Sequence, residues 1–206
     1  MHHPDSRILI FAKAPVPGRC KTRLAAGLGP RRAAAVYRRL LRATVAEAAR
    51  SRAAPVELWC SPDSRHPCFA SLRRDHAVVL RRQPGGDLGR RMHSALASAL
   101  TRSRAALVIG GDCPVLAGGH LHAALGMLAE GTDAVFAPAE DGGYALVGLR
   151  APAPALFRDV AWGGPRVMTQ TRRRLDALDL RAGYLEPVWD VDTPADFRRA
   201  RRAGLI

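Results

Sequence analysis

Short apolar runs alternate with segments of helical periodicity along the chain, and this rhythm limits the fold more than any other feature. The predicted strands are residues 7–12, 56–60, 77–81, 106–110, 133–137 and 144–149. The predicted helices are residues 31–50, 88–103, 118–129, 165–178 and 194–203. The pattern predicts a mainly parallel sheet with helices on both faces, because parallel strands need such crossovers.

The turn Asp141-Gly142-Gly143 separates two consecutive strands and therefore predicts an antiparallel insertion after the fifth strand. The 206 residues contain no internal repeat or linker and suit one domain, residues 1–206. We therefore predict a single α/β domain with a mostly parallel mixed sheet. Ligands are expected where the carboxyl ends of the strands meet their loops.

Charge raises the question of nucleic acid, because the net charge is +14 and the pI is near 11.2. The basic residues are spread along the chain, and only 5% of residues are aromatic, which is few for base stacking. A specific nucleic-acid partner is not expected, and a non-enzymatic nucleic-acid-binding protein remains the less favoured alternative. No apolar run approaches a membrane span, and no signal-peptide pattern is present, so we predict a cytoplasmic protein.

The loop after the first strand contains the only two lysines among thirty-two Lys and Arg residues, Lys13 and Lys21. A lysine retained in such a background indicates a need for a compact ammonium. Pro15 and Gly18 predict a preset bend with exposed N–H groups, and Lys21 and Arg23 add charge for a di- or triphosphate. The loop matches neither the P-loop nor the dinucleotide fingerprint. The alternative is an ordinary basic loop.

Acidic residues follow the fourth strand and precede the last helix. Asp112 comes after two glycines at the end of a buried run, where it can reach a ligand and hold Mg²⁺ or Mn²⁺. Asp190 and Asp192 alternate along an extended segment, so their carboxylates should point to opposite sides. Either can complete a metal site with Asp112, and we favour Asp192, with Asp190 close behind. The alternative is that these acids cap the start of the last helix.

Two more segments are expected to line a substrate-binding site. Residues 85–92 are rich in glycine and join a strand to a helix, which suits a base or sugar edge. Residues 140–144 combine acids, glycines and a tyrosine at a turn, which suits hydroxyl recognition or simply a tight hairpin. Trp162 is expected to close the acceptor side.

Six motifs in this order carry a family resemblance: FAKAPVPGRCKTRL, GGDLGRRM, GGDCP, AEDGGYALVGL, Trp162-Gly163 and WDVDTP. Together they resemble a small bacterial glycosyltransferase-like family with the GT-A, or nucleotide-diphospho-sugar transferase, fold. Its members are often called arsenosugar-biosynthesis or radical-SAM/selenodomain-associated transferases. The string Lys21-Thr22-Arg23-Leu24 also resembles the 2-phospholactate guanylyltransferase family, which shares the fold.

The resemblance implies roles for the loops. The nucleotide-binding residues would be Ala12, Lys13, Pro15, Gly18, Lys21, Arg23, Gly86, Asp87, Leu88 and Arg91. The divalent metal, Mg²⁺ or Mn²⁺, would be held by Asp112, Asp190 and Asp192. The acceptor would face Asp141, Gly142, Gly143, Tyr144 and Trp162.

The leading hypothesis is an enzyme that moves a sugar from a nucleotide-diphospho-sugar to a small acceptor, with Lys21, Arg23 and Asp112 as catalytic residues. The alternative is a nucleotidyltransferase that uses an NTP and a phosphorylated substrate and releases pyrophosphate. The usual glycosyltransferase D-x-D is reduced to Asp112, and the nucleotidyltransferase L-x-G-G start is absent. Both activities therefore stay open, and the sequence does not predict an oligomeric state.

Overall fold

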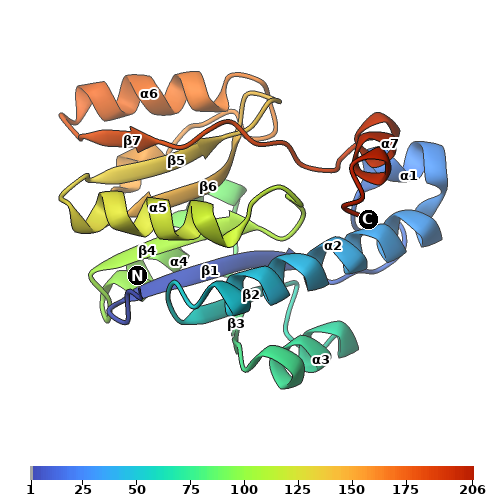
Figure 1. Cartoon of the computed structure of the whole chain (residues 1–206). Helices are drawn as coiled ribbons and strands as arrows, with labels where there is room; N and C mark the ends of the chain where they lie inside the picture. The colour runs from blue at the N-terminus through green and yellow to red at the C-terminus, as the bar shows by residue number, and fades with distance from the viewer. Residues whose placement is uncertain (1) are drawn as a thin grey trace.

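One mixed sheet of seven strands organises the computed structural model, which describes residues 2–206 (Figure 1). The strands are β1 (Ser6–Lys13), β2 (Val56–Ser61), β3 (Val79–Arg82), β4 (Ala105–Gly110), β5 (Ala134–Pro138), β6 (Tyr144–Leu149) and β7 (Ala182–Tyr184). Their order is β3-β2-β1-β4-β6-β5-β7, and only β6 runs antiparallel to its neighbours. The predicted fold class and the predicted antiparallel insertion are confirmed.

The described part of the chain also has seven α-helices and one short 3₁₀ helix, all but the last of which lie between strands along the chain. They are α1 (Thr22–Leu28), α2 (Pro30–Ser51), α3 (Pro67–His76), α4 (Leu88–Leu100), α5 (Gly118–Ala129), η1 (Pro154–Leu156), α6 (Val167–Ala177) and α7 (Pro194–Arg202). Sequence periodicity did not predict α1, α3, η1 or β7. As a consequence Arg23, expected in a loop, lies in the first turn of α1.

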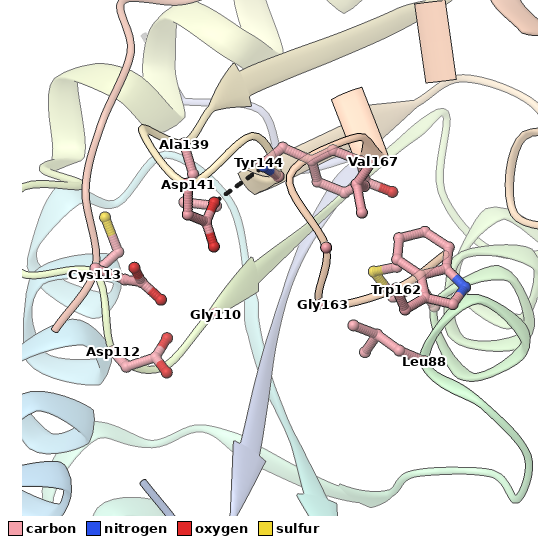
Figure 2. Close-up of a pocket in the computed structure, with 15 residues that line it drawn as sticks. Leu88, Gly110, Asp112, Cys113, Ala139, Asp141, Tyr144, Trp162, Gly163 and Val167 are labelled. Atoms are coloured by element: carbon pink, nitrogen blue, oxygen red, sulfur yellow. Dashed lines mark hydrogen bonds between the residues drawn. The ribbon is translucent and has the colours of Figure 1, made fainter. Parts of the chain in front are cut away.

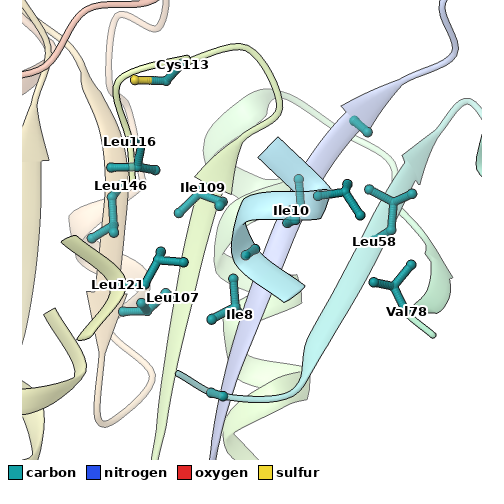
Figure 3. Packing of buried hydrophobic residues seen from close by; sticks show 14 of the residues in the cluster. Ile8, Ile10, Leu58, Val78, Leu107, Ile109, Cys113, Leu116, Leu121 and Leu146 are labelled. Carbon is teal, nitrogen blue, oxygen red and sulfur yellow. The ribbon is translucent and has the colours of Figure 1, made fainter. Parts of the chain in front are cut away.

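Successive residues of the central strands enter different apolar layers, as the period of two requires. Ile8 and Ile10 of β1 pack with α2, α3 and α5 on one face (Figure 3). Leu9, between them, packs with α4 and α6 on the other face. Burial on both faces explains why these strands read as continuous apolar runs.

A third apolar cluster joins α1, α2 and α7 beyond the carboxyl ends of the central strands (Figure 1). Leu24 of α1 and Val191, just before α7, are fully buried in it. A Cβ on Gly27 would lie 2.5 Å from Cγ of Pro194, so the glycine lets α1 and α7 approach closely. This packing brings the carboxyl-terminal segment beside the loop after β1.

Two further features concern the described residues as a whole. Within residues 2–206, no helix combines the length and apolar character that crossing a membrane requires. All four cysteines are buried free thiols.

Candidate functional site

The end of β4 is fastened to the segment that precedes α7. The Val191 N–H donates to the backbone oxygen of Asp112 at 3.3 Å. Cys113 Sγ donates to the backbone oxygen of Trp189, also at 3.3 Å. These two contacts set the segment that carries Asp190 and Asp192 directly beside Asp112.

Lys21 lies between acidic side chains from both segments. Its Nζ is 2.6 Å from Asp112 Oδ2 and 3.1 Å from Asp192 Oδ1. Arg23 also pairs with Asp192. The Lys21 side chain is only 4% exposed, and its backbone has a φ of 48°, which a non-glycine residue rarely adopts. Distant acidic segments therefore converge on a positive charge, and in this structure that charge is the lysine ammonium.

A cavity of about 370 Å³, called here the basic cavity, opens beside this ion pair. Its lining residues are Phe11, Ala12, Lys13, Cys20, Lys21, Tyr37, Gln83, Leu88, Arg91, Gly110, Gly111, Asp112 and Asp192. Of the residues predicted to bind nucleotide, Ala12, Lys13, Lys21, Leu88 and Arg91 line it. The other five predicted residues, Pro15, Gly18, Arg23, Gly86 and Asp87, do not. Asp87 instead caps α4, since its Oδ1 accepts from the Arg90 N–H at 2.8 Å.

Tyr37 of α2 lines the basic cavity and also packs in a small buried cluster with Cys20 and Ala34. Its hydroxyl oxygen accepts the Lys13 N–H at 2.9 Å, and the residue is 5% exposed. Burial, with a further contribution from the Asp112 carboxylate, raises the pKa of Tyr37. The phenol therefore stays protonated, and its proton is available to a ligand.

Gln83 is a second residue that sequence reasoning missed. Its Nε2 donates to the backbone oxygens of Trp59 at 2.8 Å and Ala12 at 3.3 Å. Its Oε1 accepts from Arg91 Nη1 at 3.4 Å. The buried amide thus ties the first loop to a guanidinium at the cavity wall. A polar residue directly after the third strand was the available signal.

The loop after β1 bends sharply, as its prolines and glycine predict. Gly18 has a φ of 77°, and space around its Cβ position is open to 4 Å. The Arg19 N–H donates to the oxygen of Val16 at 3.0 Å. Within residues 2–206 the N–H groups of Gly18, Cys20 and Lys21 meet no acceptor. Such free backbone donors beside lysine suit an anion.

A second cavity, of about 180 Å³ and called here the acidic cavity, lies on the other side of Asp112 (Figure 2). Its lining residues are Leu88, Met92, Gly110, Asp112, Cys113, Ala139, Asp141, Gly143, Tyr144, Ala145, Trp162, Gly163, Gly164, Val167 and Asp190. Four of the predicted acceptor residues, Asp141, Gly143, Tyr144 and Trp162, are among them. Both cavities include Leu88, Gly110 and Asp112.

Gly142, the remaining predicted acceptor residue, shapes the wall without lining the cavity. Its φ is 87°, and a Cβ there would lie 2.0 Å from the backbone oxygen of Pro165. The Gly143 N–H donates to Asp141 Oδ1 at 2.9 Å, so the turn also fixes the Asp141 carboxylate (Figure 2). Glycine is therefore required where this turn meets the segment after Trp162.

Aromatic rings form the wall opposite the acids. Figure 2 shows Trp162 and Leu88 across the cavity from the carboxylates of Asp112 and Asp141. The rings of Tyr144 and Trp162 meet edge to face, with centroids 6.2 Å apart and planes at 89°. Such packing holds both rings in fixed orientations.

Burial changes the ionisation of two groups at the site. Burial and the neighbouring Asp112 charge raise the pKa of Asp190, and Lys21 opposes them. Burial raises the pKa of the Cys113 thiol to about 12. Cys113 therefore carries no thiolate near neutral pH and is a poor candidate for a nucleophile.

The acids divide between the cavities in a way that bears on a metal. Asp190 lines the acidic cavity and Asp192 the basic one, as their alternation predicted, while Asp112 lines both. No group of three His, Cys, Asp or Glu among the described residues forms a metal cage. Mg²⁺ or Mn²⁺ is commonly held by one or two carboxylates together with phosphates and water. Asp112 and Asp190 line one cavity and fit that chemistry. Within residues 2–206, Asp112 is paired with Lys21 alone, whereas Asp192 is paired with both Lys21 and Arg23.

Comparison with known proteins identifies the family. Residues 44–164, more than half of the chain, match a family described as "Uncharacterized protein conserved in bacteria (DUF2064)". The chain belongs to this family. No curated protein matches this DUF2064 chain.

Solved structures share the fold over nearly all of the DUF2064 chain. A "putative nucleotide-diphospho-sugar transferase" from Desulfovibrio desulfuricans G20 has 30% identity and a TM-score of 0.84, covering 98% of this chain and 94% of that one. CMP:2-keto-3-deoxy-manno-octonic acid synthetase complexed with CTP has 12% identity and a TM-score of 0.62, covering 97% and 98%. Rv0371c complexed with manganese, from Mycobacterium tuberculosis H37Rv, has 16% identity and a TM-score of 0.56, covering 95% and 97%.

Proposed function

We propose that this DUF2064 protein is a transferase that moves a sugar from a nucleotide-diphospho-sugar to a small acceptor. The observation that carries the proposal is the meeting of two unlike cavities at Asp112. One is bordered by lysines, an arginine and free backbone donors, and suits a nucleoside diphosphate. The other is bordered by carboxylates and aromatic rings, and suits the group that receives the sugar.

The basic cavity supplies the nucleotide side. Lys13 makes no ion pair within residues 2–206, so its ammonium is available to phosphate. Arg23 has a side chain that is 60% exposed and reaches the same region from α1. Lys21 keeps Asp112 and Asp192 in place and adds positive charge behind the diphosphate.

A divalent cation fits between this cavity and the acidic one, with Asp112 and Asp190 as its protein ligands. When bound, Mg²⁺ or Mn²⁺ would supply positive charge to the diphosphate leaving group. The manganese complex of the fold neighbour Rv0371c supports this choice of metal. The sequence favoured Asp192 as the partner of Asp112, and its pairing with Lys21 and Arg23 leads us to propose Asp190 instead.

Catalysis would rest on positioning and electrostatics. The bond between the anomeric carbon and the diphosphate oxygen breaks, and the acceptor oxygen forms the new bond and loses its proton to solvent water. Nucleoside diphosphate leaves. Lys13, Lys21 and Arg91 border the place where negative charge develops, and fixed groups of this kind need no reorganisation during the reaction.

Nucleotidyl transfer is the second candidate. The likeness to a synthetase complexed with CTP favours it, because that enzyme has the same fold. The products discriminate: sugar transfer releases nucleoside diphosphate, and nucleotidyl transfer releases pyrophosphate. A broad panel of nucleotide sugars and NTPs should yield one of these products, and release of neither would contradict both candidates.

The cytoplasmic location stays a prediction from sequence.

Asp112→Asn tests the shared acid directly. We expect the variant to keep its fold and to lose Mg²⁺- or Mn²⁺-dependent nucleotide binding by at least about tenfold, because a neutral amide is a weak ligand for a hard cation. Titration calorimetry with and without Mn²⁺ measures this. Asp176→Asn, an exposed change on α6, is the control. Unchanged metal-dependent affinity in Asp112→Asn would rule out the metal assignment.

A further inference from the structure

The lining of the acidic cavity within residues 2–206 includes no basic side chain, although the protein is strongly basic overall. Its lining includes Asp112, Asp141 and Asp190, and none of the lining residues, all within residues 2–206, is Lys, Arg or His. The chain as a whole has 32 Lys and Arg residues and a net charge of +14. The adjoining basic cavity, by contrast, includes Lys13, Lys21 and Arg91. The lining side chains therefore change from basic to acidic across Asp112, whose own carboxylate is paired with Lys21.

A bound metal does not remove this asymmetry. A cation held by Asp112 and Asp190 would be coordinated at its remaining positions by the phosphates of the nucleotide. Asp141 would remain, with its carboxylate held in the cavity wall by the Gly143 N–H. A phosphate or carboxylate entering here would meet a like charge and no basic side chain among the lining residues. An anion so placed is repelled by the carboxylates.

The remaining wall is apolar, with one polar group available. Trp162, Tyr144, Met92 and Val167 form this side of the cavity. Burial raises the pKa of Tyr144, so its hydroxyl stays protonated. A ligand that combines an apolar face with hydroxyl or amino groups would contact the rings, the tyrosine hydroxyl and the acids together.

We propose that the second substrate is a small molecule without phosphate or carboxylate, which presents O–H or N–H donors to Asp141 and an apolar face to Trp162. The inference rests on the proposed function, because it takes the acidic cavity as the acceptor side. Hydroxyl and amino compounds share this chemistry. The inference favours sugar transfer over nucleotidyl transfer to a phosphorylated substrate.

The first experiment measures the charge of the cavity without any substrate. Cationic and anionic nitroxides of matched size are added separately, and the paramagnetic relaxation enhancement of each backbone amide is measured. The ratio of the enhancement by the cationic nitroxide to that by the anionic one, called here the nitroxide ratio, should be higher at Gly143 and Gly163 than at average exposed amides. Amides of residues 13–21 should show the reverse and act as an internal control. An equal or lower ratio at Gly143 and Gly163 would overturn the proposal.

The second experiment ranks matched probes: glucose, glucosamine, glucose 6-phosphate and glucuronate. Shifts of the Trp162 indole and Gly143 amide resonances give apparent affinities, with Mg²⁺ and a nucleoside diphosphate present. We expect each anionic probe to bind at least about tenfold more weakly than its uncharged parent. Tighter binding of either anion than of glucose would overturn the proposal. If no probe shifts these resonances, the nitroxide ratio decides alone. Selective binding of glucosamine distinguishes amino from hydroxyl recognition.

Asp141→Asn tests whether the Asp141 carboxylate causes the charge selectivity of the acidic cavity. Asn keeps an oxygen that accepts the Gly143 N–H, so the turn should survive and the amide spectrum should otherwise be unchanged. We expect the nitroxide ratio at Gly143 to fall and the discrimination against glucose 6-phosphate to narrow. Asp176→Asn removes the same charge on exposed α6 and should change neither value. An unchanged ratio in Asp141→Asn would contradict the assignment.

The outcome is separable from that of the proposed function. Nucleotide binding in the basic cavity is followed independently, by thermal shift with nucleoside diphosphates and Mn²⁺. If no nucleotide stabilises the protein while the acidic cavity still ranks the probes as expected, the proposed function fails and the charge selectivity stands. If nucleotide binds and the anionic probes bind best, the inference fails and the proposed function stands.

Discussion

Lys21 keeps its ammonium at a place where two carboxylates would otherwise face each other. Its side chain is almost fully buried, and its backbone is left-handed at the start of α1. Each feature costs free energy: a left-handed non-glycine residue about 1–2 kcal/mol, and a buried charge several kcal/mol unless it is paired. Their coincidence in one residue indicates that this exact shape of cation is required by the site rather than by the fold.

Lys21→Arg tests that requirement. The planar guanidinium is larger than an ammonium, and we expect overpacking to lower the free energy of unfolding by about 1–3 kcal/mol and to weaken nucleotide binding. Urea unfolding and calorimetry measure these effects. Lys13→Arg is the matched control, since Lys13 is exposed, and its unfolding free energy should stay within about 0.5 kcal/mol of the wild type. An equally stable Lys21→Arg variant would show that compactness is not the reason for lysine.

Tyr37→Phe separates a hydroxyl from the ring that carries it. The Lys13 N–H loses its acceptor, so we expect a loss of about 1–2 kcal/mol in unfolding free energy and weaker nucleotide binding. Thr44→Val, on the same face of α2, is the control. Thr44 Oγ1 is buried without a hydrogen-bond partner in the described chain, so its removal should leave both quantities unchanged or improved. Nucleotide affinity that is equal in Tyr37→Phe and wild type would contradict the ligand-facing role.

The residues of the candidate site differ in how readily they can be predicted from the sequence. Lys21 and Asp112 were visible because each departs from its background, one as a rare lysine and one as an acid behind glycines. Tyr37 was hidden because an apolar helical stripe explains it fully, and only tertiary contact turns its hydroxyl toward the loop. Gln83 was hidden because a polar residue after a strand is common.

Elements with strong periodicity were predicted, and those that depend on neighbours were not. α5 has the predicted bounds. α7 begins with a capping box of Thr193 and Asp196, so neither Asp190 nor Asp192 supplies its cap. α1 has seven residues, includes a glycine, and is stabilised by packing on α2 and α7. β7 has three residues and exists by pairing with β5. α3 had a signal that was overlooked, since Pro67 occupies its first turn.

Gly142→Ala tests the turn that joins β5 and β6. The added Cβ would overlap the Pro165 backbone and require a strained φ, so we expect a loss of at least about 2 kcal/mol in unfolding free energy. Gly126→Ala is the contrasting control: in α5 its Cβ meets open space, and alanine should stabilise the helix by about 0.5–1 kcal/mol. Chemical denaturation measures both. A Gly142→Ala variant as stable as wild type would mean that the turn is not held against Pro165.

At the scale of the molecule, net charge and site chemistry predict different salt dependences. We expect non-specific RNA binding to fall by at least about tenfold between 50 and 200 mM salt, because it depends on counterion release from phosphates. Metal-dependent nucleotide binding should fall less, since its contacts lie in a partly enclosed cavity. Filter binding and calorimetry give the two curves. RNA affinity that survives high salt and exceeds nucleotide affinity would support a nucleic-acid-binding protein instead.

The shared wall at Asp112 has a thermodynamic consequence. A ligand that changes the charge around this carboxylate from one side changes the field felt from the other, so the two binding equilibria cannot be independent. By reciprocity, whatever factor nucleotide contributes to acceptor affinity, acceptor contributes to nucleotide affinity. If nucleotide and acceptor occupy the two cavities as proposed, the Asp112 that lines both couples their affinities.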